Sequence, residues 1–291
     1  MKFYKYQGAG NDFLIADNRD GAISLTPEQI AALCDRRYGV GADGMMLLDA
    51  PIDRTSSDNL SPSKDGFAMT YYNSDGSGGM MCGNGGRCIV AFAADMGIKE
   101  FSFHAADGYH RADILASEGH IKTVQLLMKD VKEYKYYKEL SGVAVPSAGY
   151  FLDTGTRHYV RIVENLDKYD IISEGREIRY NAAELQPIGV NVNFIEPVGS
   201  ILKVRTYEKG VEDETFACGT GIVASCIAAY KAGILPSETW NQGRRVRYDV
   251  QAKRDRLSVE FTISDVSNGV AEEIYLTGPA AYVAEIDVPH F

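Results

Sequence analysis

Apolar and polar residues alternate along most of this 291-residue chain. Alternation with a period of two is typical of β-strands that bury one face, and the runs are rich in the strand-forming residues Tyr, Val, Ile and Phe. In chain order the runs are KFYKYQ, FLIADN, GMMLLD, FAMTYYN, FSFHA, YHRADIL, IKTVQLLM, YFLDT, HYVRIV, NVNFIEP, ILKVRTYE, RVRYDVQ, LSVEFTI and EEIYLTG. The pattern therefore predicts a protein built mainly from strands.

Three segments follow helical periodicity instead. The first is TPEQIAALCDRR, in which Thr26 is placed to cap a helix, Pro27 to occupy its first position and Gln29 to complete a capping box. The other two begin directly after Cys82 and Cys218 and consist mainly of small and apolar residues without proline. We expect three α-helices among the strands.

The two cysteine-led segments are copies of one another. CGNGGRCIVAFAADMG, residues 82–97, aligns with CGTGIVASCIAAYKAG, residues 218–233, at an offset of 218 − 82 = 136 residues. Each copy closes on a glycine, Gly97 or Gly233, where a left-handed residue commonly ends a helix. The alignment extends outward, because GAGNDFLI matches DTGTRHYV and YYN matches TYE. We infer a duplicated domain in which a pseudo-twofold axis brings the equivalent helix starts to face one cleft.

Two polar segments connect these elements. Residues 129–142, KDVKEYKYYKELSG, shift from apolar strand to Lys, Tyr and Glu, and we interpret them as the crossing between the halves, with a boundary near residue 130. Residues 51–65, PIDRTSSDNLSPSKD, lack periodicity and are expected to form a solvated loop, with a lid as the alternative.

Charge and composition narrow the class of function. A formal net charge of −10, without any Lys/Arg cluster interleaved with aromatic residues, argues against nucleic acid as a partner. No apolar run approaches the roughly 18 residues of a membrane span, and the N-terminal stretch lacks the apolar core of a signal peptide. We therefore expect a cytoplasmic protein with no membrane partner.

The chain has five cysteines, an odd number that argues against a disulfide framework. No C-x-x-C pair occurs and no histidine lies close to Cys82 or Cys218, so we expect no metal. The stretch NSDGSGG lacks the alternating acidic ligands and the closing Glu of a calcium loop. Cys88 and Cys226 lie inside the helical segments among apolar neighbours, where we expect inert core residues.

Cys82 and Cys218 differ from the other cysteines because each stands at a helix start. The positive end of the helix dipole and the unpaired backbone N–H groups there stabilise a thiolate. The glycines that follow leave these N–H groups uncovered, so that a carboxylate can approach closely. These glycines are Gly83 and Gly85 in the first copy and Gly219 and Gly221 in the second.

A pair of such sites predicts a reaction. With one small carboxylate held by both helix starts, one thiolate removes the α-proton from one face while the opposite thiol delivers a proton to the other, which inverts the stereocentre. The N–H donors would stabilise the enediolate-like charge that develops on the carboxylate. This design does not require pyridoxal phosphate, and we hypothesise that no cofactor takes part.

The motifs together resemble those of the diaminopimelate epimerase family, over essentially the whole chain. They are GAGNDF (8–13), DRRYGVGADG (35–44), NSDGSGGMMCGNGGRC (73–88), GVNVNF (189–194), TYEKGVEDETFACGTG (206–221) and LTGPA (276–280). The resemblance implies an α/β (α+β) fold of two pseudo-symmetric domains, each a mostly antiparallel sheet wrapped around a central helix. It implies halves at residues 1–130 and 131–276, with a final strand at about 277–291 that returns to the first.

The resemblance also implies an isomerase that interconverts LL- and meso-diaminopimelate for lysine and cell-wall synthesis, as a homodimer. It assigns the acid/base pair to Cys82 and Cys218. It assigns the donors to the reacting carboxylate to Gly83, Asn84, Gly219 and Thr220, and the contacts to the distal amino-acid group to Asn11, Asn73, Asn191 and Glu208.

Three departures from the family pattern fall in the distal contacts. Lys209 stands where the family usually has arginine, which replaces a planar fork with a single ammonium. Thr156 and Arg157 stand where the family usually has asparagine and proline, and we expect Arg157 to point to solvent. The segment GVEDET is a residue longer than the commonest form, which we expect to alter only a turn. His158, which follows, is expected to orient the substrate ammonium or to support a thiol.

Two alternatives remain open at this stage. One is a related two-cysteine racemase of another amino acid, which would not need distal groups for a second ammonium and carboxylate. The other is a non-catalytic amino-acid-binding protein of the same fold, which would not need both cysteines.

Overall fold

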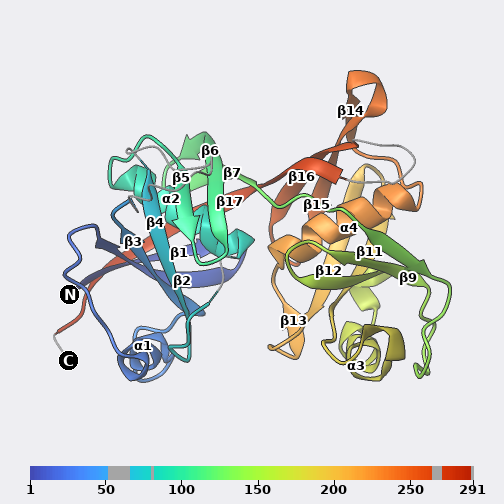
Figure 1. Ribbon diagram of the computed structural model, residues 1–291, viewed down its shortest axis with the longest axis horizontal. Helices are drawn as coiled ribbons and strands as arrows, with labels where there is room; N and C mark the ends of the chain where they lie inside the picture. Colours follow the sequence, from blue (N-terminus) through green and yellow to red (C-terminus); the bar gives the residue numbers. More distant parts are fainter. Residues whose placement is uncertain (52–65, 80–81, 264–270, 290–291) are drawn as a thin grey trace. The chain divides into compact units, whose positions relative to one another are not determined.

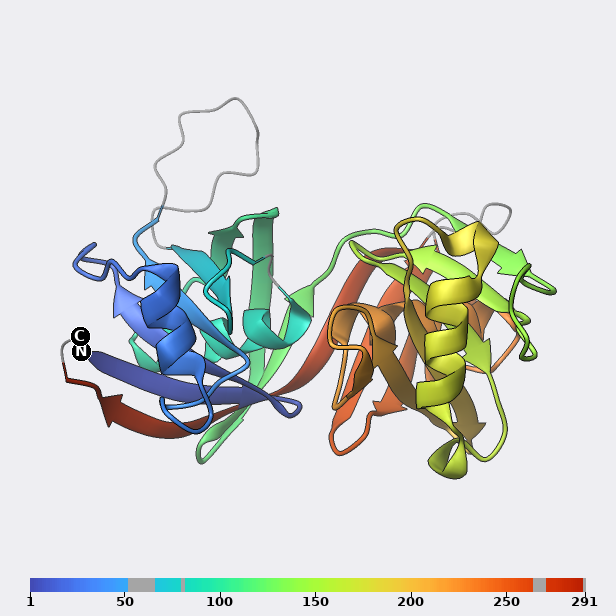
Figure 2. The ribbon, with the colours of Figure 1, turned by 90° about the horizontal axis from the view of Figure 1, so that it is seen from below.

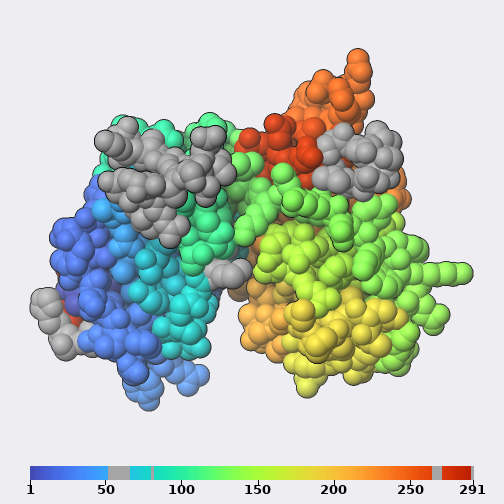
Figure 3. Space-filling model, in the orientation of Figure 1, coloured from blue at the N-terminus to red at the C-terminus, as the bar shows by residue number. Residues whose placement is uncertain are grey.

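The structure is a computed structural model that describes residues 1–51, 66–79, 82–263 and 271–289. The loop expected at residues 51–65 therefore lies outside the described residues except for Pro51. The chain divides into two compact units (Figures 1 and 2). Unit 1 comprises Met1–Leu127 and Gly278–Phe291, and unit 2 comprises Met128–Thr277. Figure 3 shows one face of each unit, on which the coloured side chains are packed closely together.

Unit 1 is a sheet wound around one helix. Its strands, within the described residues, are β1 (Lys2–Gly8), β2 (Asn11–Asn18), β3 (Gly44–Asp49), β4 (Phe67–Asn73), β5 (Ser102–Ala105), β6 (Gly108–Glu118), β7 (Ile121–Leu127) and the second part of β17 (Ala271–Asp287). Neighbours pair in the order β17–β1–β2–β3–β4–β5–β6–β7, and β7 pairs with β17 again. The pairings therefore close into a barrel, which leaves no free edge along the circle.

Unit 2 repeats this plan. Its main strands are β8 (Tyr134–Tyr137), β9 (Gly149–Asp153), β10 (Arg157–Ile162), β11 (Asn191–Val198), β12 (Ile201–Glu208), β15 (Arg245–Gln251), β16 (Arg256–Ile263) and the first part of β17. They pair in this order, and a bridge between Val131 and Ala271 joins the segment before β8 to β17. Two short strands, β13 (Asp213–Thr215) and β14 (Glu238–Trp240), pair with β12 and β15.

The strand directions repeat as well. β2–β3 and β4–β5 are parallel in unit 1, as are β10–β11 and β12–β15 at the corresponding places in unit 2. The other pairings are antiparallel. The expected fold, with two similar halves of mostly antiparallel sheet, is confirmed. The segment expected only to cross between the halves is different in one respect, because it contains strand β8, whose tyrosine-rich sequence favours extended structure.

The described residues contain four α-helices: α1 (Pro27–Cys34), α2 (Gly83–Asp95), α3 (Ile171–Asn181) and α4 (Gly219–Lys231). Three short 3-10 turns, η1 (Leu166–Lys168), η2 (Ala183–Leu185) and η3 (Asn241–Gly243), complete the helical structure. The capping box of α1 is present, because Thr26 Oγ1 accepts from Gln29 N–H and Gln29 Oε1 accepts from Thr26 N–H. Gly97 and Gly233 follow α2 and α4 with positive φ, as expected.

The expectation of only three helices is wrong, because α3 lies between β10 and β11. It is the counterpart of α1, which lies between β2 and β3. The repeat could have revealed it, since the start of α1 shifted by the offset falls at 27 + 136 = 163, eight residues before Ile171. Its apolar stripe is thin, with Ile171 and Ile178 buried, so hydrophobic periodicity alone gave little signal.

Helices α2 and α4 form the centres of the two units. Every residue of α2 from Gly83 to Ala93 is buried, and α4 is nearly as enclosed. A helix that is buried on all sides requires other structure around it, which the strands of each unit provide. Cys88 and Cys226 are 0% exposed within these helices, and burial raises the pKa of both thiols well above the ordinary value. Both cysteines are therefore core residues, as expected.

Candidate active site

Cys82 is the N-cap residue of α2. Its backbone is extended, with φ −107° and ψ 154°, and its Sγ accepts a hydrogen bond from Gly85 N–H at 3.3 Å. The side chain is half-buried. The thiol therefore takes the position of a serine or aspartate cap, in contact with the N–H groups that stabilise a thiolate.

Cys218 is the N-cap residue of α4, at the equivalent place in unit 2. Its φ is also −107°, but its side chain makes no cap hydrogen bond. Instead Cys218 Sγ lies 3.5 Å from Thr220 Oγ1. The two thiols thus share a backbone position, but Cys82 Sγ accepts from a backbone N–H, whereas Cys218 Sγ lies against a side-chain hydroxyl.

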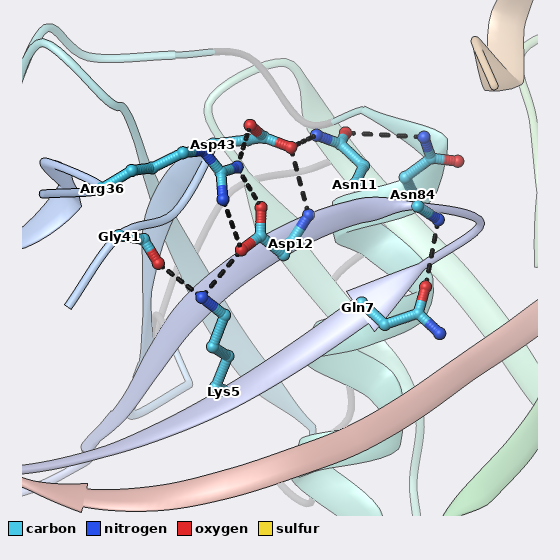
Figure 4. Close-up of polar contacts among 9 residues, drawn as sticks. Lys5, Gln7, Asn11, Asp12, Arg36, Gly41, Asp43 and Asn84 are labelled. Carbon is cyan, nitrogen blue, oxygen red and sulfur yellow. Dashed lines mark hydrogen bonds and ion pairs between the residues drawn. The ribbon is translucent and has the colours of Figure 1, made fainter. Parts of the chain in front are cut away.

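Two asparagines meet beside Cys82. Asn84, in the first turn of α2, donates from Nδ2 to Asn11 Oδ1 at 3.5 Å, and Asn11 donates from Nδ2 to Asp43 Oδ2 at 2.6 Å (Figure 4). Asn11 lies at the start of β2, directly after the β1–β2 turn, where Gly10 has a φ of 88°. The fold therefore brings together two residues expected to contact substrate.

A charged network supports this pair from the outer side. Arg36 donates to both Asp12 and Asp43, and Lys5 pairs with Asp12 at 2.8 Å (Figure 4). Burial acts to raise the pKa of Asp12, but the hydrogen bonds and charges of Arg36 and Lys5 outweigh it, so the pKa lies below the ordinary value. Two carboxylates and two cations thus balance one another.

Two threonines occupy the equivalent positions in unit 2. Thr156 Oγ1 lies 3.0 Å from Thr220 Oγ1, and both hydroxyls lie within 3.0 Å of His158 Nε2. Thr156 follows Gly155, whose φ of 100° matches that of Gly10. The structure therefore confirms the alignment of GAGNDFLI with DTGTRHYV and extends it to side-chain contacts.

His158 is fully buried in β10 beneath this hydroxyl pair. Asn193 Nδ2 lies 3.0 Å from His158 Nδ1, and Asn193 Oδ1 accepts from Thr206 Oγ1 at 2.9 Å. Burial disfavours the charged imidazole and lowers its pKa to about 3. His158 is therefore neutral at physiological pH. It can form a hydrogen bond with the Thr220 hydroxyl but places no positive charge beside it.

The other expected substrate contacts lie at strand ends. Asn73 ends β4 and donates to Ser77 Oγ at 3.0 Å, while Glu208 ends β12 and accepts from Thr215 Oγ1 at 2.7 Å. Asn191 begins β11, where its amide joins Arg157 O at 3.2 Å to Lys209 N–H at 2.9 Å. The Lys209 side chain itself is exposed.

Arg157 does not simply point to solvent, so that expectation is wrong. Its guanidinium lies 5.0 Å from the centre of the Phe151 ring and donates to Leu185 O at 3.2 Å. An arginine gains by stacking on an aromatic ring of an adjacent strand, and β9 supplies one.

Sequence reasoning missed three residues that hold the site: Arg87, Asp43 and Asn193. Arg87 is 0% exposed and donates to Asn84 Oδ1 at 2.9 Å. Each lies in a motif that was recognised for other residues, and an arginine in the middle of a buried helical segment is the signal that could have singled out Arg87.

Within the described residues, no group of three or more His, Cys, Asp or Glu side chains is arranged to hold a metal ion. The helices that the structure describes include none with the length and apolar character needed to cross a membrane.

The family model for diaminopimelate epimerase matches residues 3–131 and 150–283. The chain belongs to the diaminopimelate epimerase family. It is 40% identical over 295 residues to the diaminopimelate epimerase of Flavobacterium psychrophilum, with 99% of this chain and 100% of that protein covered. It is 40% identical to the enzyme of Chlorobaculum tepidum over 282 residues, covering 95% and 96%. The matched ranges include Cys82 and Cys218 and the helices that follow them.

More distant proteins share the fold. A Bacillus anthracis phenazine biosynthesis protein of the PhzF family superposes with a TM-score of 0.67 at 16% identity, covering 100% of this chain and 99% of the other. A hydroxyproline epimerase from Agrobacterium vitis superposes with a TM-score of 0.64 at 15% identity, covering 98% and 91%. At these identities the likeness establishes the architecture alone.

Proposed function

We propose that this protein interconverts LL- and meso-diaminopimelate by moving the α-proton between the thiols of Cys82 and Cys218. The observation that carries the proposal is the duplicated helix start, where a cysteine caps each central helix directly before a Gly-x-Gly turn. Membership of the family supports the choice of substrate.

The proposed reaction conserves protons. One sulfur, as thiolate, removes the α-proton and becomes a thiol, while the other thiol donates its proton to the opposite face and becomes the thiolate. The carbon is inverted and the two sulfurs exchange roles, and exchange of their protons with solvent restores the starting form of the enzyme before the next molecule of the same isomer binds. Because the residues themselves carry the proton, the proposal includes no cofactor.

Backbone N–H groups hold the reacting carboxylate in this proposal. The donors are those of Gly83, Asn84, Gly219 and Thr220, in the first turns of α2 and α4. Each preorganised donor that strengthens as the enediolate-like charge forms is worth roughly 3–4 kcal/mol in comparable oxyanion sites. The positive end of each helix dipole also stabilises this negative charge.

The remaining predicted site residues are proposed to bind the distal end of diaminopimelate. Asn11, Asn73, Thr156, Asn191, Glu208 and Lys209 combine carboxylate and amide oxygens for an ammonium with N–H donors and a cation for a carboxylate. His158 is proposed to position Thr220, and through it Cys218, because it lies 3.0 Å from the Thr220 hydroxyl.

We further propose a cytoplasmic homodimer whose domains divide near residue 130, with the final strand completing the first domain. Sedimentation equilibrium of the purified chain tests the assembly, and a mass of one chain across the working concentration range would reject the dimer.

Deuterium wash-in tests the function. The purified protein is incubated in D₂O with LL-diaminopimelate, meso-diaminopimelate or a panel of other L-amino acids, and deuterium at the α-carbon is measured by mass spectrometry. We expect exchange with both diaminopimelate isomers. Exchange only with another amino acid would identify a related racemase, whereas binding of diaminopimelate without exchange would identify a binding protein.

A further inference from the structure

We infer that Arg87 and Asp43 are positioning residues that fix the direction of the Asn84 and Asn11 amides from opposite ends of one hydrogen-bonded chain. This inference rests on the proposed function, because it concerns how the same site recognises a carboxylate.

Arg87 holds the first end. It is 0% exposed, and its guanidinium donates to Asn84 Oδ1 at 2.9 Å, to Gly83 O at 3.1 Å and to Pro279 O at 3.4 Å. A guanidinium has donors only, so the Asn84 group that faces it must be the carbonyl oxygen. The contacts to α2 and to β17 keep the guanidinium in place.

Asp43 holds the other end. Its Oδ2 accepts from Asn11 Nδ2 at 2.6 Å and from Asp12 N–H at 3.2 Å, while its Oδ1 accepts from Arg36 at 2.6 Å (Figure 4). An ionised carboxylate has acceptors only, so the Asn11 group that faces it must be the NH₂. The salt bridge to Arg36 at 2.6 Å fixes the orientation of the Asp43 carboxylate.

The two ends together determine the middle contact. With the Asn84 oxygen on Arg87 and the Asn11 NH₂ on Asp43, the Asn84 NH₂ must meet the Asn11 oxygen, as the 3.5 Å contact shows. All donors in the chain then point from Arg87 toward Asp43. Asn84 consequently directs N–H groups, rather than its oxygen, away from Arg87, which suits a carboxylate ligand and repels an ammonium at that place.

Unit 2 lacks this arrangement, which shows that the fold does not require it. The residue equivalent to Arg87 is 87 + 136 = 223, a buried valine, and the two amides are replaced by the hydroxyls of Thr156 and Thr220. A hydroxyl both donates and accepts, so it needs no fixed direction. Arg87 and Asp43 thus occur in the unit that has the two amides, Asn84 and Asn11, whose donor and acceptor ends must be oriented.

A double-mutant cycle tests the chain. Arg87→Lys keeps the charge but loses the fork, and Asp43→Asn removes the obligatory acceptor; both are compared with the unchanged protein by KM and kcat for both diaminopimelate isomers. We expect each single change to lower kcat/KM about tenfold, mainly through KM, by releasing one amide. We expect kcat/KM of the double variant to be little lower than that of either single variant. Release of the chain at one end already lets both amides turn, so release of the second end adds little.

Asp17→Asn is the matched control. Asp17 is a β2 carboxylate of similar exposure that pairs with Arg19, away from the amides. We expect Asp17→Asn to leave KM and kcat of the unchanged protein as they are. In combination with Arg87→Lys, we expect it to add nothing to the loss that Arg87→Lys causes by itself. A loss in the Arg87→Lys/Asp43→Asn variant of about one hundredfold, the product of two independent effects, would overturn the inference.

A spectroscopic measurement covers the case in which Arg87→Lys fails to fold. The side-chain ¹⁵N–H₂ resonances of Asn84 are assigned in the unchanged protein, in Asp43→Asn and in Asp17→Asn. We expect Asp43→Asn to shift them although Asp43 does not bond to Asn84, and Asp17→Asn to leave them in place. Unchanged resonances in Asp43→Asn would reject the chain, whereas an unchanged protein that exchanges no diaminopimelate α-proton would reject only the proposed substrate.

Discussion

Thr156 Oγ1 lies 3.0 Å from Thr220 Oγ1, at the same place in unit 2 where Asn11 meets Asn84 in unit 1. The duplication has therefore preserved a contact between the hairpin turn and the first turn of the central helix, while changing its chemistry. In unit 1 the contact joins two amides held between an arginine and an aspartate, in the helical turn that Cys82 caps. In unit 2 it joins two hydroxyls above a neutral imidazole, and one of these hydroxyls lies 3.5 Å from Cys218 Sγ. The two thiols of the proposed acid/base pair thus have unequal surroundings.

Removal of either helix-start thiol tests the acid/base assignment. We expect Cys82→Ala and Cys218→Ala to reduce epimerisation by at least about 10²–10⁴-fold, the usual contribution of a positioned acid or base, as measured by the rate of conversion between the isomers. Cys88→Ala and Cys226→Ala are the matched controls, because they remove a thiol from the same helices inside the core. These controls should lower the melting temperature but retain kcat, and retained activity in Cys82→Ala or Cys218→Ala would exclude the two-thiol mechanism.

Equivalent glycines in the two helices should respond differently to alanine. A Cβ at Gly221 would lie 2.4 Å from Asn193 Oδ1 and 3.2 Å from His158 Cε1, whereas a Cβ at Gly85 would meet its nearest atoms, Cys82 Sγ and Met46 Sδ, at 3.4 Å. We expect Gly221→Ala to cost about 1–3 kcal/mol of unfolding free energy through overpacking. Gly85→Ala should range from neutral to about 1 kcal/mol stabilising, because alanine favours the helix.

Urea denaturation of both glycine variants provides the measurement. The two changes are chemically identical and occupy repeat-equivalent positions, so each serves as the control for the other. Equal changes in unfolding free energy would contradict the prediction, because they would show that His158 and Asn193 can move aside for the new methyl group without loss of stability.

The burial of His158 should make folding stability depend on pH. Its pKa is about 3 in the folded protein and near 6.5 in the unfolded chain, so between these values the unfolded state binds a proton that the folded state does not. As far as His158 is concerned, the folded state is therefore most stable above pH 6.5. The free energy of unfolding falls as the pH drops from 6.5 toward 3, by up to about 1.4 kcal/mol per pH unit.

Unfolding free energies at pH 7, 6 and 5 check this for the unchanged protein and for His158→Gln, which lacks the titrating group. We expect a shallower pH dependence in His158→Gln, whatever its stability at pH 7. His120→Gln, which alters an exposed histidine, should retain the slope of the unchanged protein. Parallel curves for all three proteins would contradict a neutral, desolvated His158.

Lys209→Arg tests the departure in the distal contacts. If Lys209 binds the distal carboxylate, the guanidinium fork should make two parallel hydrogen bonds in place of one, and KM should fall about three- to tenfold with little change in kcat. Steady-state kinetics with LL-diaminopimelate provide the measurement. Lys203→Arg is the control, because Lys203 pairs with Asp167 at 2.6 Å elsewhere in unit 2 and should leave KM unchanged. An unaltered KM in Lys209→Arg would remove Lys209 from the site.

Local patterns predicted the features that depend on near neighbours in the chain. The alternating runs correspond to strands, Thr26 caps α1 as expected, and Cys82 and Cys218 stand at helix starts. Caps and strand alternation arise within a few residues, so sequence contains them directly. Helix α3 was not predicted because it has no broad apolar stripe. Its stability comes from packing, with Gly175 against Tyr207.

The sequence by itself determined the duplication, the strand-rich halves and the position of both thiols, because each follows from periodicity or self-similarity along the chain. Only the tertiary structure decided which polar side chains meet. Asn11 and Asn84 are 73 residues apart, and Thr156 and Thr220 are 64 apart. Their contacts exist because each sheet closes around its central helix and brings the hairpin turn onto the first helical turn. The directed chain from Arg87 to Asp43 depends on that closure, which no local pattern encodes.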